Sequence, residues 1–211
     1  MKTFDSSLYF ITDSTGFSEE EFLQKTEEAL KGGITLLQLR EKDKTTREYL
    51  DLARKVHKLT RQYHVPLIID DRLDIAMAMD AEGVHLGQSD MPIDIARNIF
   101  GKDKIIGATA KTVEQATEAY NQGADYLGVG AIFPTTTKVK TVLTSTETLN
   151  NICKAVPIPV NAIGGLNKDN IHVLKDIPIS GICVVSAIMK ADNPKKAAVE
   201  LREKNRSELG I

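Results

Sequence analysis

Eight short apolar runs recur along the chain, and this repetition limits the folds that the chain can adopt. The runs are largely continuous, which is typical of strands in a parallel sheet whose two faces are both covered. Stretches with helical spacing of apolar residues lie between the runs, among them residues 19–33, 45–63, 112–123 and 193–206. The predicted strands are residues 8–13, 35–41, 66–71, 83–88, 104–110, 126–133, 158–165 and 181–188.

The number of runs favours a closed barrel over an open sheet. The chain has 211 residues, so each of eight units has roughly 26 residues, the size of a βα repeat. Five or six units would instead form an open doubly wound sheet. No GxGxxG motif follows the first run, where LYFITDSTGF stands. We therefore predict an α/β fold, a single-domain (β/α)8 TIM barrel with short loops over residues 1–211.

Composition argues against several other classes of protein. The chain is 42% hydrophobic and 27% charged with a net charge of −2, which fits one buried core and gives no sign of a nucleic-acid surface. Cys153 and Cys183 have apolar neighbours and no CxxC spacing, so we expect no disulfide framework and a cytoplasmic location. The start, MKTFDSSLYF, has no long apolar segment, so we expect neither a signal peptide nor a membrane span.

Polar residues gather at the carboxyl ends of the predicted strands, which is where a barrel of this kind carries its active site. The amino ends carry far fewer. We therefore predict a polar rim as the candidate site. Its members are Gln38, Arg40, Glu41, Lys42, Asp70, Asp71, Arg72, His85, Gln88, Asp90, Thr109, Lys111, Thr135, Thr136, Thr137, Lys138, Asn161, Gly164, Gly165 and Ser186.

The second predicted strand shows how rim residues are oriented. Side chains alternate along a strand, so Gln38 and Arg40 face the barrel interior if Leu37 and Leu39 pack under the helices. A charged side chain near the barrel mouth needs a partner to offset its desolvation. A ligand would provide one for Arg40; an ordinary ion pair with Glu41 or Asp71 is the alternative.

Two carboxylates close adjacent predicted strands. Asp71 and Asp90 offer rigid oxygen ligands with room for water, which suits Mg²⁺. Either residue alone could instead cap the helix that follows it. Both together, beside the cationic residues Arg40, Lys42 and Lys138, favour a site for a metal ion and a diphosphate.

Two further segments have the chemistry of anion sites. FPTTTKVK places the hydroxyl groups of Thr135 and Thr137 and the charge of Lys138 just past the sixth predicted strand, although a polar surface loop is the alternative. Gly164–Gly165 precedes a predicted helix start, and Ser186 closes the last strand. Phosphate sites recur there in barrels, although the glycines could simply allow a turn.

The motifs QLREK, IIDDR, GVHLGQSD, DYLGVGAIFPTTTK, AIGGL and VVSAI resemble those of thiamine phosphate synthase in order and spacing, over essentially the whole chain. The resemblance implies a transferase of thiamine biosynthesis that requires Mg²⁺. This family joins 4-amino-5-hydroxymethyl-2-methylpyrimidine diphosphate to 4-methyl-5-(2-hydroxyethyl)thiazole phosphate and releases diphosphate. The implied mechanism is dissociative: diphosphate leaves first, and the thiazole nitrogen then captures the pyrimidine cation.

Carried over to matching positions, the resemblance implies a role for each rim residue. Asp71 and Asp90 would hold Mg²⁺, and Gln38 would contact the pyrimidine. The diphosphate would be bound, and its departure catalysed, by Arg40, Lys42, Thr109 and Lys138. The thiazole phosphate would be bound by Thr135, Thr137, Gly165 and Ser186.

This chain departs from the family pattern at two places. Asp70, also expected at the substrate site, stands where the family commonly has Asn, and its charge would repel a diphosphate unless a metal or Arg72 neutralises it. GATAK, residues 107–111, replaces a G-[VI]-S-x-H pattern, so Lys111 stands in place of an imidazole.

Two alternative functions stay open from the sequence, a thiazole tautomerase-like isomerase and a non-catalytic phosphate-binding barrel. The expected partners are the two small-molecule substrates, with no nucleic acid and no membrane, and a homo-oligomer is left open.

Overall fold

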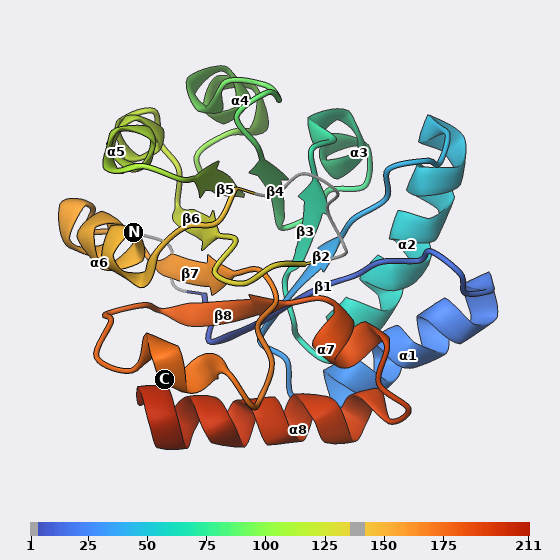
Figure 1. The fold of residues 1–211 in the computed structure, drawn as a ribbon. Coiled ribbons are helices and arrows are strands. Elements are labelled where there is room, and N and C mark those ends of the chain that lie inside the picture. The colour runs from blue at the N-terminus through green and yellow to red at the C-terminus, as the bar shows by residue number, and fades with distance from the viewer. Residues whose placement is uncertain (1–3, 136–141) are drawn as a thin grey trace.

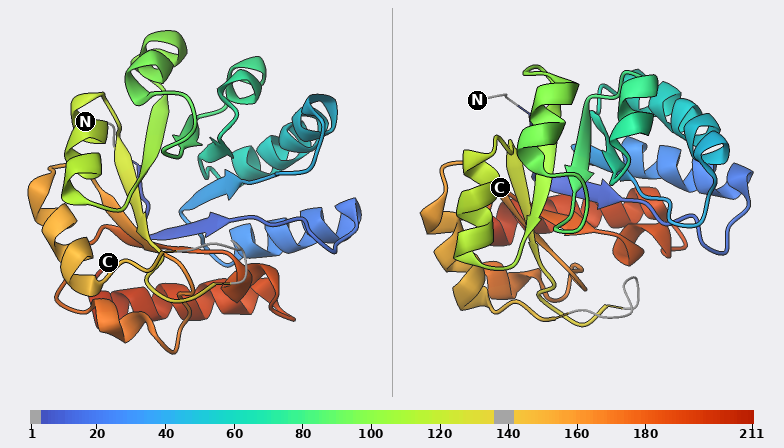
Figure 2. Two further views of the ribbon diagram at one scale, coloured as in Figure 1. Left: turned by 45° about the horizontal axis from the view of Figure 1, so that its top comes forward. Right: turned by 90° about the horizontal axis from the view of Figure 1, so that it is seen from above.

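Eight parallel strands close into a barrel in chain order, with helices around it (Figures 1 and 2). The structure is a computed structural model that describes residues 4–135 and 142–211. The predicted barrel and all eight predicted strands are confirmed. The strands are β1 (Leu8–Ile11), β2 (Leu36–Leu39), β3 (Leu67–Asp70), β4 (Gly83–Leu86), β5 (Ile105–Ala110), β6 (Tyr126–Gly130), β7 (Val160–Ile163) and β8 (Gly181–Val184).

The four helices predicted by residue range are confirmed as α1, α2, α5 and α8, and α6 is a helix that we did not predict. The helix expected after Gly164–Gly165 is a short 3-10 helix rather than an α-helix: η1 (Ile171–Leu174) has four residues. No helix within the described residues is long and apolar enough to cross a bilayer. The helices are α1 (Glu19–Lys31), α2 (Thr46–Gln62), α3 (Leu73–Ala78), α4 (Ile93–Phe100), α5 (Val113–Asn121), α6 (Thr146–Ala155), α7 (Ser186–Met189), α8 (Pro194–Lys204) and the π-helical turn η2 (Asn205–Leu209).

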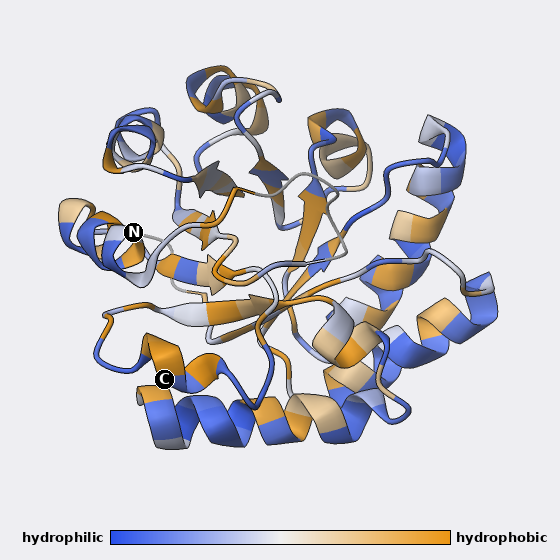
Figure 3. Cartoon of the chain, viewed as in Figure 1, coloured by the Kyte–Doolittle hydropathy of each residue, from blue (hydrophilic) through white to orange (hydrophobic). Residues whose placement is uncertain are grey.

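Helix α2 shows why these segments form helices and where they dock. Thr45 and Glu48 form a reciprocal capping box that begins the helix. Tyr49, Leu52 and Val56 follow at helical spacing and are buried against the barrel. Blue and orange residues alternate along α2 and α8 in Figure 3, as expected for helices with one buried face.

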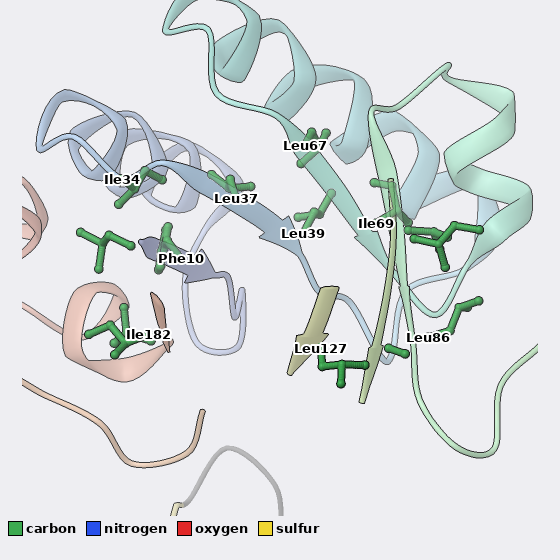
Figure 4. Close-up of a cluster of buried hydrophobic side chains, with 14 of the residues drawn as sticks. Phe10, Ile34, Leu37, Leu39, Leu67, Ile69, Leu86, Leu127 and Ile182 are labelled. Atoms are coloured by element: carbon green, nitrogen blue, oxygen red, sulfur yellow. The ribbon is translucent and has the colours of Figure 1, made fainter. Parts of the chain in front are cut away.

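The strands separate two apolar cores. Leu37 and Leu39 belong to the large core between barrel and helices (Figure 4). Phe22 of α1 and Tyr49 of α2 belong to the same core. The opposite faces of the strands build a smaller core inside the barrel, from Tyr9, Ile11, Leu36, Ile68, Ile105, Tyr126 and Cys183. The predicted alternation along β2 is therefore confirmed, and Gln38 faces the barrel interior.

Asn161 was predicted at the rim, and this prediction is wrong. It lies near the amino end of β7, where its Nδ2 donates to the carbonyl oxygen of Ser6 at 2.7 Å and its Oδ1 accepts from Ser6 Oγ at 3.1 Å. A Cβ on the neighbouring Gly181 would lie 1.9 Å from the Ser6 carbonyl oxygen. Asn161 therefore joins the chain start to β7 at the floor of the barrel.

Candidate active site

The ends of β2 and β3 bring cations and carboxylates together. Lys42 Nζ lies 2.8 Å from Asp70 Oδ2 and also contacts Asp71 Oδ2. Arg40 Nε lies 3.8 Å from Asp70 Oδ2. Arg40 therefore forms an ion pair, the alternative left open by the sequence, but its partner is Asp70 rather than Glu41 or Asp71. Glu41 instead accepts a hydrogen bond from Ser14 Oγ at 2.7 Å.

Asp70 is a buried carboxylate, with 7% of its surface exposed. Burial, and next the charge of Asp71, raise its pKa to about 6, while Lys42 and Arg40 oppose the rise. The expected pairing with Arg72 is wrong: the Arg72 guanidinium donates to Asp74 Oδ1 at 2.8 Å and to Thr46 Oγ1 at 2.8 Å. Lys42, with a smaller contribution from Arg40, offsets the charge of Asp70.

Asp71 and Asp90 approach each other from the ends of β3 and β4. Asp71 has a φ of 60°, and its backbone N–H donates to the His85 carbonyl oxygen at 2.8 Å, which holds its loop against β4. Asp90 Oδ2 accepts from the Gly87 N–H at 2.7 Å. Burial raises the pKa of Asp90; the Gly87 N–H opposes this rise, and the hydrogen bond and charge of the neighbouring Asp71 add to it. The two carboxylates are therefore close enough to repel each other.

The alternative that these residues cap helices is wrong. The N-cap residues of α3 and α4 are Arg72 and Pro92, and neither helix has a side-chain cap. Helix capping therefore accounts for neither carboxylate.

The available side chains fit Mg²⁺ better than a metal ion whose ligands all come from the protein. Within residues 4–135 and 142–211, no three His, Cys, Asp or Glu side chains are grouped as a metal site. Mg²⁺ commonly takes one or two carboxylates and completes its shell with water and phosphate oxygens. Two mutually repelling carboxylates, Asp71 and Asp90, provide that arrangement, so the residues fit the ion.

A chain of hydrogen bonds crosses the barrel interior below the rim. It joins Gln38 to Tyr9, Tyr9 to Tyr126, Tyr126 to His85 and His85 to Thr109. Tyr9 and Tyr126 had no predicted role, because they lie within apolar runs. Their inward position could have been found by counting alternate residues along β1 and β6.

The segments that follow β6 and β7 pack closely against each other, and Gly165 makes this close approach possible. Gly165 has a φ of 65°, and a Cβ there would lie 2.7 Å from Phe133 Cβ and 2.8 Å from the Pro134 carbonyl oxygen. The Phe133 N–H donates to the Gly164 carbonyl oxygen at 3.0 Å. Gly165 thus permits the segment that leads to Thr135 to lie close to β7.

Gln88 is exposed after β4, where its Nε2 donates to the Thr109 carbonyl oxygen at 2.7 Å, and Lys111 follows β5, where its backbone N–H donates to Gln115 Oε1 at 2.8 Å. Ser186 is exposed at the first position of α7, directly after β8. Thr136, Thr137 and Lys138 lie outside the described residues. In the closed strand order, β7 and β8 lie across the barrel from β3 and β4. Gly165 and Ser186 are therefore at the opposite side of the mouth from the carboxylate cluster.

Comparisons with known proteins agree along the whole barrel. A family model described as thiamine monophosphate synthase matches residues 8–188. The thiamine-phosphate synthase of Methanobrevibacter smithii is 50% identical over 201 residues, which are 95% of this chain and 96% of that protein. The enzyme of the same name from Clostridium tetani is 48% identical over 95% of this chain and 96% of that protein.

Solved structures give the same result. Thiamine phosphate pyrophosphorylase from Pyrococcus furiosus superposes with a TM-score of 0.88 at 42% identity, over 97% of this chain and 98% of that one. A 3-hexulose-6-phosphate synthase has a TM-score of 0.70 over 94% of this chain and 99% of its own, but only 19% identity, so that likeness concerns the fold alone.

Proposed function

The chain belongs to the thiamine monophosphate synthase family and is a transferase that makes thiamine phosphate, and from this premise we propose how its residues divide the work. Relatives that are 48% and 50% identical are named as synthases, so we set the isomerase and the non-catalytic barrel aside. The observation that carries the proposal is the cluster at the ends of β2, β3 and β4. There, Arg40 and Lys42 stand among the carboxylates of Asp70, Asp71 and Asp90.

We propose that Asp71 and Asp90 hold Mg²⁺ at this cluster. When bound, the ion supplies positive charge to the leaving diphosphate. The mutual repulsion of the two carboxylates supports this role, because a divalent cation between them would remove it. Lys42, which pairs with Asp71 in the free chain, would then be released toward the diphosphate.

The chain's own groups stabilise charge rather than attack the substrate. As the bond from the pyrimidine methylene carbon to the diphosphate oxygen breaks, negative charge grows on that oxygen. Arg40, Lys42 and the Thr109 hydroxyl are placed at the end of the barrel where such charge would be met. Gln38, just below the rim, contacts the pyrimidine and holds the resulting cation for capture by the thiazole nitrogen.

The thiazole phosphate is assigned to the opposite side of the mouth. The Gly165 backbone and Ser186 lie at the ends of β7 and β8, and Thr135 lies on the segment packed against Gly165. Thr137 is proposed at the same phosphate and Lys138 at the leaving diphosphate, from the sequence only. One barrel would therefore carry both substrates; the homo-oligomer and the cytoplasmic location stay predictions.

Turnover of both substrates with and without Mg²⁺ tests the assignment. Asp71→Asn and Asp90→Asn remove charge at nearly constant size, and each should lower Mg²⁺-dependent turnover by about 100-fold or more. Asp94→Asn is the matched control, since Asp94 is exposed in the first turn of α4, and it should retain turnover. Unchanged Mg²⁺ dependence in both rim variants would sink the assignment.

A further inference from the structure

Five side chains from five strands or strand ends form one continuous hydrogen-bonded chain inside the barrel. Gln38 Nε2 donates to Tyr9 Oη at 2.7 Å, and the hydroxyl groups of Tyr9 and Tyr126 are 2.7 Å apart. His85 Nδ1 lies 3.1 Å from Tyr126 Oη, and His85 Nε2 lies 2.9 Å from Thr109 Oγ1. The two ends of the chain, Gln38 and Thr109, are residues of the proposed substrate site.

The partners at each step leave little freedom in the direction of the protons. Burial raises the pKa of both Tyr9 and Tyr126 well above the ordinary value, so each phenol is neutral and has one proton to donate. Tyr9 accepts from Gln38, so its own proton points to Tyr126. Tyr126 then donates to His85 Nδ1.

The direction continues through the imidazole. A neutral histidine that accepts at Nδ1 carries its proton at Nε2, and this proton points to the Thr109 oxygen. The Thr109 hydroxyl proton is then left to donate to a ligand. In the reverse arrangement every proton is turned, and Thr109 can only accept from the ligand side. The five groups therefore switch together or not at all.

Glycines make room for this chain. A Cβ on Gly107 would lie 2.1 Å from Tyr126 Cζ and 2.3 Å from its hydroxyl oxygen. A Cβ on Gly128 would lie 3.3 Å from His85 Cε1. Neither glycine has a positive φ that would explain its presence, so the space itself is what they provide. The arrangement is therefore accommodated by residues that contribute nothing else to it.

We propose that Tyr9, Tyr126 and His85 are positioning residues that couple Gln38 to Thr109, so that an anion at the Thr109 end and the pyrimidine at the Gln38 end stabilise the same donor direction. The two ends are assigned to substrate by the proposed function, on which this inference rests. A diphosphate oxygen accepts the Thr109 proton and thereby stabilises the direction that the Gln38 donor already gives the chain in the free protein.

The selected direction suits the pyrimidine as well. Gln38 then points Nε2 at Tyr9 and keeps Oε1 to accept from the exocyclic amino group of the pyrimidine. That amino group donates electron density to the cation left when diphosphate departs. The chain thus links recognition of the leaving group to orientation of the ring that must bear the charge.

Histidine ring ¹⁵N shifts test the chain in the free protein, without any turnover. The wild type should have His85 as one tautomer, with its proton at Nε2. Tyr126→Phe removes the donor to Nδ1 and should give a mixture of tautomers. Tyr63→Phe is the control, because the Tyr63 hydroxyl bonds Glu27 in the helical layer, and it should leave His85 unchanged. A wild-type proton at Nδ1, or an unaltered tautomer in Tyr126→Phe, would overturn the proposal.

A double-mutant cycle tests the coupling during catalysis. Tyr9→Phe breaks the chain next to Gln38 and Thr109→Val removes its other end, and each should lower kcat/KM for the pyrimidine diphosphate by about tenfold. The double variant should lose little more than either single variant, because both changes disable one unit. The losses in kcat/KM from Tyr9→Phe and Lys42→Arg should instead multiply in the double variant, because Lys42 is not part of the hydrogen-bonded chain. If the losses in kcat/KM multiply for Tyr9→Phe and Thr109→Val, the coupling is ruled out even though the enzyme is active. An inactive wild type would contradict only the proposed function. In that case the tautomer measurement still tests the hydrogen-bonded chain.

Discussion

At the residue scale, the unusual feature is a buried acid whose charge the fold does not favour. Asp70 stands next to Asp71, and burial together with that neighbour raises its pKa to about 6. Lys42 is shared between the two carboxylates and so compensates each only in part. Among the described residues of this cluster, the three carboxylates of Asp70, Asp71 and Asp90 stand beside two cations, Lys42 and Arg40.

Asp70→Asn should remove a pH dependence of stability in metal-free protein. Because the pKa is raised from 3.8 in the folded state, stability from this group is full below about pH 4 and is lost as pH rises to about 6. A difference of this size corresponds to about 3 kcal/mol, so the variant should be more stable than the parent by up to that amount at pH 7. Urea denaturation between pH 4 and pH 7 measures this.

A contrasting variant checks the sign. The pKa of Asp74 is lowered, mainly by its hydrogen bonds with Arg72, so Asp74→Asn should lose stability at pH 7 rather than gain it. Diphosphate binding by Asp70→Asn should be unchanged or tighter. A large loss of turnover in Asp70→Asn would show that the carboxylate is a required ligand.

At the scale of elements, the loops after β6 and β7 act as one unit. Backbone hydrogen bonds join Ile132 to Ile163 and Phe133 to Gly164, both beyond the end of β6. The predicted strand over 126–133 is therefore right in place but too long, since β6 ends at Gly130. Close packing of the two loops, rather than further strand, positions the proposed phosphate site.

Gly165→Ala should disturb that unit. Alanine at this position would have to adopt a positive φ, and its Cβ would clash with Phe133 and Pro134, so the loop after β6 would have to move. We expect a loss of about 2–3 kcal/mol in the free energy of unfolding and a raised KM for the thiazole phosphate. Gly210→Ala is the control: it is a left-handed residue with φ 72° and ψ 20° and no atom within 4 Å, so it should cost only about 1 kcal/mol. Equal effects of both variants on KM would contradict the proposed site.

At the scale of the whole molecule, the barrel has a chemically active mouth and a structural floor. Asn161 and Ser6 exchange two hydrogen bonds at the floor, next to the pairing of β7 with β8. Asn205 Nδ2, after α8, donates to the Ser7 carbonyl oxygen at 2.9 Å. These contacts join the segment just before β1 to segments more than a hundred residues away, so they support closure rather than chemistry.

Asn161→Ala should therefore weaken the fold and spare the chemistry. It leaves the buried Ser6 carbonyl group without its partner and should lower the free energy of unfolding by about 2–4 kcal/mol. Turnover per folded molecule should not change, because the residue lies at the other end of the barrel. Asn151→Ala, on an exposed position of α6, should have little effect on stability. A fall in kcat of Asn161→Ala under fully folded conditions would place this residue in the site after all.

Periodicity alone determined most of the architecture. Eight continuous apolar runs predicted eight parallel strands, and polar residues clustered at their carboxyl ends predicted the mouth of the barrel. These patterns are local, since each depends on how side chains alternate within one strand or repeat along one helix. For that reason they also gave the inward direction of Gln38.

Contacts across the barrel were decided only by the tertiary structure. The stagger and closure of the strands determine which side chains at similar heights meet, and no single strand contains that information. Asp70 thus finds Lys42 rather than Arg72, Asn161 lies at the floor, and Tyr9 meets Tyr126, which is 117 positions away in the chain. The sequence could name polar groups near the strand ends, but the closed barrel decides which of them share a proton, a charge or a ligand.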